Sequence, residues 1–338
     1  ENLGLWQGLL KWSLQYSDGT TNRPEGEMSE ERRKFLEKAM EGLGRTEVDA
    51  IKGNMAVVLE NPRVYFEDGL GGTDLESRLD ALENVLDVVD NLDNAKSLVP
   101  LGFFSPIIGL LRCNYAEVKK LAARIIAVCS QHNPPCQQHA LEGGALSVLM
   151  PMLHDRDVRT QALSAVTCLL GGHSDGLALF ANLGGGRVLA ALLDGELRGD
   201  EEDPRFQLRL LHTLAALAVD ARTAERLNEA GVGSSLLDYL TNSSRFEGGN
   251  GWHRREKGLR ALALLSRAPA LGAQPARTLE VVSATRSDYQ ALPPDDQAAH
   301  REVVQYLDDL VEAVSSPVPQ AAPLAIAMAS PIGAGGNA

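Results

Sequence analysis

The side chains that could carry catalysis or hold a metal ion are few and scattered along the chain. The seven histidines form no HxxxH or HExxH pattern, which places two zinc ligands on one helix face in metalloproteases. His132 and His139 are seven residues apart, but Pro134 and Pro135 lie between them and interrupt a shared helix. The four cysteines show no CxxC spacing, so the sequence predicts reduced thiols and no metal site.

Motifs for phosphate binding and for nucleophilic catalysis are missing from the sequence as well. The glycine clusters at 184–186 and 248–251 lack the Lys-Ser/Thr pair of a phosphate-binding loop, and no GxSxG occurs. Acidic pairs such as Asp87 and Asp90 fall on an exposed helix or turn, where solvated charge is the expected role. We therefore expect a protein that is not an enzyme and that uses no cofactor.

The composition of the chain favours a large all-helical protein. Its 338 residues are 44% hydrophobic but only 5% aromatic, which suits helices packed through Leu and Ala better than β-sandwiches. The 45 acidic and 32 basic residues give a net charge of −13, which argues against a nucleic-acid partner. No apolar run approaches the ~20 residues that span a bilayer, so we expect no membrane segment.

An internal repeat of about 40 residues decides the predicted fold. Four segments share a glycine followed by a Leu-rich stretch, and the glycines are separated by 42, 40 and 47 positions. We attribute the longer third interval to an acidic insertion, Gly195–Asp203. We expect each glycine to end one helix and to precede the next. The segments are LGFFSPIIGLL (101–111), GGALSVLMPML (143–153), LGGGRVLAALL (183–193) and AGVGSSLLDYL (230–240).

Each segment is followed by a longer helix with one apolar stripe, here called the third helix of its repeat. Spacing of i, i+4, i+7, i+8 and i+11 places these residues on one helix face. A short helix, a glycine, a second helix and a long third helix indicate an armadillo-repeat, right-handed superhelical solenoid, all-α with flanking helices at both ends. The stripes are Val118, Ala122, Ile125, Ile126 and Cys129; Val158, Ala162, Ala165, Val166 and Leu169; Phe206, Leu210, Thr213, Leu214 and Leu217; and Gly258, Ala261, Leu262 and Leu265.

The same patterns predict the domain organisation. The N-terminal region contains predicted helices at 5–16, 29–42 and 47–60, the second with Ser29 as its N-cap, and the C-terminal region includes one at 297–315. The Ala/Pro/Gly-rich composition of the last residues predicts disorder. The predicted domains are an N-terminal helical region at 1–66, armadillo repeats at 73–268, C-terminal capping helices at 279–315 and a disordered tail at 316–338.

The face opposite the apolar stripes is the candidate binding surface. In armadillo stacks the third helices line the concave side, so residues at matching positions form ladders across the repeats. Basic residues gather there although the chain is acidic, which indicates a partner with an acidic or polar surface. The ladders are Arg124, Ser164, His212 and Arg260, and beside them Leu121, Gln161, Arg209 and Lys257, with Lys120 next to the first member.

Trp6 and Trp12 make the first predicted helix strongly amphipathic. Two interpretations stay open: this helix packs onto the rest of the N-terminal region, or it docks into an apolar groove of a partner.

Several segments resemble one known family in the same order along the chain. WQGLLKWSLQYSDGT (6–20) and MSEERRKFLEKAM (28–40) resemble the N-terminal helices of the armadillo-type nucleotide exchange factors of heat-shock protein 70 chaperones, in their cytosolic plant and fungal branch. VVDNLDNAKSL (88–98) resembles the first-repeat signature of that family, and AVCSQHNPPCQ (127–137) its second-repeat run, with His132 in place of an Asn. VRTQALSAVTCLL (158–170) and RFQLRLLHTL (205–214) resemble the third helices that follow.

This resemblance implies a cytosolic, non-enzymatic co-chaperone, and we expect it to be monomeric. Such a protein grips lobe II of the nucleotide-binding domain of heat-shock protein 70 with its concave face, and it promotes the release of ADP and then of substrate. Trp6 and Trp12 are candidate contacts to the substrate domain of the chaperone. The residues expected to contact the partner on the concave face are Lys120, Arg124, Gln161, Ser164, Arg209, His212, Lys257 and Arg260.

The alternative is an armadillo adaptor that binds a different protein. Adaptors that capture extended peptides carry regularly repeated Trp and Asn on their third helices. The corresponding positions of this chain hold Arg124, Ser164, His212 and Arg260, and Val128, Cys168, Ala216 and Leu264. The endoplasmic-reticulum relatives of the exchange factors would need a signal peptide and commonly a retention signal. This sequence ends in Gly-Gly-Asn-Ala, so we expect a cytosolic protein.

Overall fold

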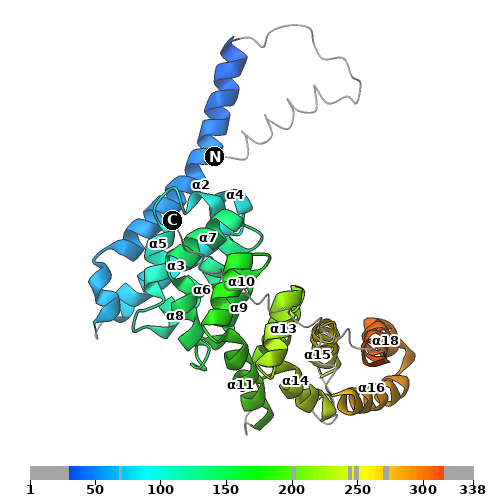
Figure 1. The fold of residues 1–338 in the computed structure, drawn as a ribbon. Helices are drawn as coiled ribbons and strands as arrows, with labels where there is room; N and C mark the ends of the chain where they lie inside the picture. Colours follow the sequence, from blue (N-terminus) through cyan, green and yellow to red (C-terminus); the bar gives the residue numbers. More distant parts are fainter. Residues whose placement is uncertain are drawn as a thin grey trace, which may run out of the picture. The chain divides into compact units, whose positions relative to one another are not determined.

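A computed structural model describes residues 30–67, 71–198, 203–242, 246, 251–268 and 274–315, and these residues form helices and no strand (Figure 1). The chain divides into two compact units at Leu179 and Phe180, within α10. Unit 1 contains α2 (Glu30–Leu59), η1 (Pro62–Phe66), α3 (Gly72–Val89), α4 (Leu92–Ser97), α5 (Phe104–Leu110), α6 (Ala116–Ser130), α7 (Pro134–Glu142), α8 (Ala145–Met152), α9 (Arg159–Leu170) and the start of α10 (Ser174–Asn182). Unit 2 continues with α11 (Gly185–Arg198), α12 (Pro204–Leu217), α13 (Ala221–Glu229), α14 (Val232–Thr241), α15 (Gly251–Leu265), α16 (Pro275–Gln290), α17 (Pro294–Ala299) and α18 (Glu302–Ser315).

The predicted third helices are α6, α9, α12 and α15, and their apolar stripes form the core. Every residue of the four predicted stripes is buried. Within unit 1, α3 packs against α6 and α6 against α9, and within unit 2, α12 packs against α15 and α15 against α18. One repeat alone cannot bury the apolar stripe of its third helix. Each third helix therefore depends on the helices of neighbouring repeats to cover that stripe. The all-α armadillo prediction is confirmed.

The repeated glycines adopt the backbone conformation that the repeat requires. Gly102, Gly144, Gly184 and Gly231 have φ between 73° and 92°, the left-handed region that side chains with a Cβ disfavour. Gly144 and Gly231 are the N-caps of α8 and α14, so the glycine turns the chain from one helix into the next, as predicted.

Two glycine substitutions are expected to change stability in opposite directions. Gly102 has φ 77° and open space around its Cβ position, so Gly102→Ala should cost about 1–2 kcal/mol through backbone strain alone. Gly53 lies inside α2 with the same open space, and there Gly53→Ala should stabilise the helix by about 0.5–1 kcal/mol. Urea denaturation followed by circular dichroism measures both, and equal shifts of the same sign would contradict this assignment.

Three regions differ from the predicted helix boundaries. The two helices expected at 29–42 and 47–60 form one continuous helix, α2. Gly42 and Gly44 weaken a helix without removing a hydrogen bond, and no proline occurs within α2 to break it. The acidic insertion begins as helix, because α11 has 14 residues where α8 has eight. The helix expected at 297–315 is divided at His300 and Arg301 into α17 and α18.

Other predicted features fall on residues that the structure does not describe. They are the helix at 5–16 with Trp6 and Trp12, the cap Ser29 and the tail at 316–338. The domain boundaries at 66, 73, 268 and 279 also stay predictions. Among the described residues no single helix has the length and apolar composition of a membrane span, and the bent pair α10 and α11 reaches both measures only when taken together.

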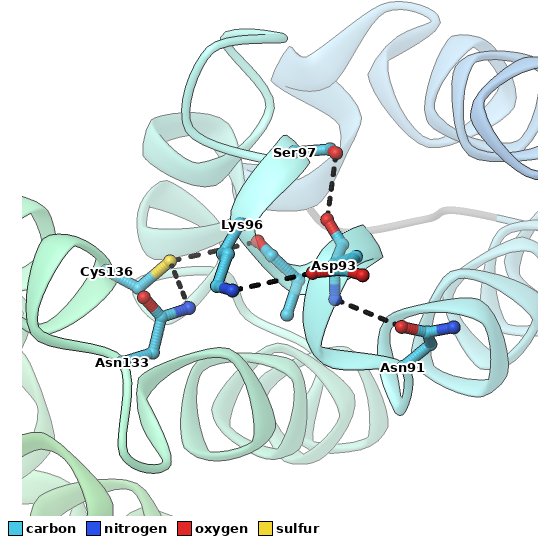
Figure 2. A network of polar contacts seen from close by, with 7 residues as sticks. Asn91, Asp93, Lys96, Ser97, Asn133 and Cys136 are labelled. Atoms are coloured by element: carbon cyan, nitrogen blue, oxygen red, sulfur yellow. Dashed lines mark hydrogen bonds and ion pairs between the residues drawn. The ribbon is translucent and has the colours of Figure 1, made fainter. Parts of the chain in front are cut away.

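The two signature segments of the repeat region contact each other at a joint between repeats (Figure 2). The Cys136 thiol at the start of α7 donates to the carbonyl of Ala95 in α4 at 3.7 Å and accepts from Asn133 Nδ2 at 3.1 Å. Asn91 caps α4, because its Oδ1 accepts the backbone N–H of Asp93 at 3.0 Å. These residues therefore hold one repeat on the next.

Candidate functional site

The ladder residues of unit 1 lie on α6 and α9, which pack side by side. Arg124 is exposed, whereas Lys120, Gln161 and Ser164 are half-buried. Lys120 Nζ lies 2.8 Å from Glu117 Oε1, so a neighbouring carboxylate offsets its charge. Ser164 Oγ donates to the carbonyl of Thr160 at 3.0 Å, within its own helix. Arg124 is thus the strongest candidate contact among the four.

One of the predicted ladders is wrong at Leu121, which is buried. Its position matches Gln161 on α9, but Leu121 is only 6% exposed and belongs to the core of unit 1. A leucine at this position packs inward against neighbouring helices because burial of its apolar surface is favourable. The second ladder therefore has no member on α6.

The ladder residues of unit 2 lie together on α12 and α15. His212 and Arg260 are exposed and occupy matching positions, one on each helix. Partial burial, then the charges of Arg209, Arg260 and Lys257, lower the pKa of His212 below its usual value. All three cations are thus close enough to act on one imidazole. We call these four residues (Arg209, His212, Lys257 and Arg260) the basic cluster.

The buried carboxylate of the preceding residue on α15 holds Lys257 in place. Glu256 is 6% exposed, and its carboxylate lies 3.0 Å from Lys257 Nζ and 2.8 Å from His300 Nδ1. Burial raises the pKa of Glu256, but the hydrogen bonds from His300 and Lys257 prevail and lower it below its usual value. Glu256 therefore stays ionised and fixes the place of Lys257 at the edge of the cluster.

Helix α18 brings a second acidic residue, Glu302, to the region of the basic cluster. The sequence prediction missed the role of this helix. Val303, Leu307 and Leu310 form a buried stripe, so α18 packs on α15 as a further third helix and not only as a cap. Tyr306 donates to Glu302 Oε2 at 2.8 Å. Burial and Glu302 raise the pKa of Tyr306 to about 12, against the opposing charge of Arg260. The i, i+4, i+7 spacing of the stripe was the available signal.

Two further features of the described residues concern metal ligands and a cavity. No three His, Cys, Asp or Glu side chains in the described ranges come together as metal ligands. An open cavity of about 310 Å³ lies between α10, α11 and α13, with Arg187, Thr223, Arg226 and Glu229 among its lining residues. These helices are not the ones that carry the basic cluster.

Comparison with solved structures supports the fold. A crystal structure of an engineered protein superposes with a TM-score of 0.59 at 19% identity and covers 79% of this chain and 96% of its own. A designed armadillo repeat protein superposes with a TM-score of 0.55 at 19% identity and covers 73% of this chain and 96% of its own.

Comparison with known sequences identifies relatives along most of the described chain. The Hsp70-binding protein 1 of Mus musculus is 32% identical over 213 residues, which are 61% of this chain and 59% of that protein. The chain thus spans about three fifths of the length of that relative. The Hsp70 nucleotide exchange factor FES1 of Saccharomyces cerevisiae is 27% identical over 242 residues, which are 70% of this chain and 80% of that protein.

Two family models match adjoining parts of the sequence. The model described as nucleotide exchange factor Fes1 matches residues 6–98, and the SIL1/FES1/HPBP1 C-terminal domain matches residues 94–232. Together they take in the N-terminal region and the repeats up to the start of α14. The chain therefore belongs to the SIL1/FES1/HPBP1 family.

Proposed function

We propose that this protein is a non-enzymatic co-chaperone, a nucleotide exchange factor for a cytosolic heat-shock protein 70. The observation that carries the proposal is the basic cluster, in which Arg209, Lys257 and Arg260 surround His212 on the third helices of a chain with net charge −13. Membership of the family and the printed names of its relatives supply the class of partner.

The third helices form the proposed contact surface. Their concave face would hold lobe II of the nucleotide-binding domain, with the basic cluster and Arg124 directed at acidic groups of the chaperone. Armadillo stacks suit this task because a curved row of helices offers a large contact area without a deep pocket. The protein acts as a monomer in this proposal, with Trp6 and Trp12 available to the substrate domain.

Exchange follows from a difference between two binding affinities. The protein must bind the ADP-free chaperone more tightly than the ADP-bound chaperone. By thermodynamic linkage, ADP binding is weakened by the same factor, tenfold for each ~1.4 kcal/mol of difference. ADP then leaves, ATP binds in its place, and substrate is released. No bond is made or broken, so no catalytic group is needed.

Release of a fluorescent ADP analogue from a cytosolic heat-shock protein 70 tests the proposal directly. We expect the full chain to accelerate release in a dose-dependent manner, because the protein and ADP each weaken the binding of the other to the chaperone. The variant with Arg187→Glu and Arg226→Glu is the control, since both residues are exposed and lie on α11 and α13. Unchanged release with both proteins folded would overturn the proposal and favour an armadillo adaptor.

A further inference from the structure

His212 is the member of the basic cluster whose charge responds to pH near neutrality. It lies on α12 one turn after Arg209, and the charges of Lys257 and Arg260 on the packed helix α15 also act on it. Partial burial and these three charges all lower the pKa of His212, so the imidazole is neutral at pH 7. Three permanent cations therefore surround one neutral, exposed ring that can still accept a proton.

No acidic group is among the described residues that shift the pKa of His212. On α15 the nearest carboxylate to the cluster belongs to Glu256, which Lys257 and His300 already engage at 3.0 and 2.8 Å. Helix α11 also packs against α12, and its charged residues in the described range include Asp194 and Glu196. Glu196 is buried and accepts from Gln207 at 3.3 Å. Among the described residues Lys257 is thus paired with Glu256, whereas Arg209 and Arg260 form no ion pair. On α18, which packs on α15, Glu302 accepts from Tyr306, and the charge of Arg260 acts on that tyrosine.

We propose that the basic cluster receives carboxylate groups of the chaperone and that docking adds a proton to His212. This inference rests on the proposed function and specifies the chemistry of its contact surface. On the surface of a folded protein partner the available anions are Asp and Glu side chains, which match three cations arranged on two adjacent helices. Carboxylates placed beside the ring favour the imidazolium form, so the bound state holds a proton that the free state lacks.

The sign of the pH dependence follows from linkage. In the free protein His212 titrates below its ordinary range, and in the complex it titrates higher. Between these two values the complex binds up to one proton more than its separated components, so affinity rises as pH falls, by up to about tenfold per pH unit. Above the higher value and below the lower value this contribution to the pH dependence vanishes.

Titration calorimetry of the full chain with heat-shock protein 70 tests the inference. Measurements between about pH 6 and about pH 8, in buffers of different ionisation enthalpy, count the protons taken up on binding. We expect wild type to take up a fraction of a proton more than His212→Gln, which keeps a polar side chain but cannot be protonated. The control His154→Gln removes an exposed histidine of unit 1 and should keep the uptake of wild type. His212→Arg fixes the charge and should bind with the weaker pH dependence of His212→Gln.

The outcomes separate this inference from the proposed function. If wild type binds and His212→Gln shows the same proton uptake, His212 is not the linked group and the inference is wrong while the exchange-factor proposal stands. If wild type fails to bind the chaperone at every pH, the proposed function fails and the inference fails with it. If only His212→Gln loses the uptake, both are supported.

Discussion

Asp288→Ala is expected to destabilise the protein by about 3 kcal/mol, because it leaves a buried guanidinium without its anion. The side chain of Arg255 is 2% exposed, and its Nη1 lies 2.7 Å from Asp288 Oδ2. Burial lowers the pKa of Arg255, and the hydrogen bond and charge of Asp288 oppose that shift. The pair joins α15 to α16, with further contacts of Arg255 to Thr285 Oγ1 at 3.0 Å and to the Trp252 ring at 5.0 Å.

The Arg286–Asp308 pair provides a matched control between α16 and α18. These side chains are 46% and 59% exposed and lie 2.8 Å apart, so Asp308→Ala should change stability by less than about 1 kcal/mol. Chemical denaturation followed by circular dichroism compares the two variants. The double variant Arg255→Met, Asp288→Ala should be more stable than Asp288→Ala alone, because it also removes the buried positive charge that Asp288 offsets. A double variant less stable than Asp288→Ala would show that packing and not charge dominates at Arg255.

The repeats were predictable from the sequence because their determinants are local. A glycine with φ between 73° and 92°, followed by a stripe at helical spacing, appears in every copy and needs no knowledge of distant residues. The exposed position of Arg124 followed from the same spacing. Such periodic patterns fix which face of a helix is buried, and that sufficed to predict both the fold and the face that carries the basic residues.

The contacts that define the charge of the site were not predictable in the same way. Glu256 meets His300 across 44 residues, and Arg255 meets Asp288 across 33. These pairs depend on how α16, α17 and α18 pack on α15, where the glycine and Leu-rich signal of the repeats is missing. The pairing of Lys120 with Glu117 was readable from its i, i+3 spacing, whereas the burial of Leu121 depends on tertiary packing.

Two of the segments that resemble the family, 88–98 and 127–137, have structural roles in this chain. Cys136 and Ala95 join α7 to α4, and Gln137 Nε2 donates to the carbonyls of Cys168 and Gly171 at 2.8 and 2.9 Å in the following repeat. A motif of this kind identifies the fold and the stacking of repeats. The proposed contact surface instead uses exposed residues of the third helices, and two of them, Arg209 and His212, lie in another segment that resembles the family, 205–214.

Reversing two charges of the basic cluster is expected to weaken chaperone binding by about 100-fold or more. Arg209→Glu with Arg260→Glu places two carboxylates where the proposed surface receives carboxylates, and each repulsive contact costs a few kcal/mol. Both side chains are exposed, so the variant should fold like wild type. The control Arg187→Glu with Arg226→Glu changes the net charge by the same amount outside the cluster and should bind within a few-fold of wild type.

Association kinetics then decide what the basic cluster contributes. Charges that only steer the encounter change the association rate, and salt removes their effect because it screens interactions beyond roughly 10 Å. Charges in direct contact change the dissociation rate, and part of that change survives at high salt. We expect the Arg209→Glu, Arg260→Glu variant to dissociate faster than the control at every salt concentration, because the cluster lies on the third helices that form the proposed contact surface. A defect confined to association and abolished by salt would place the true contact elsewhere and reduce the cluster to a steering role.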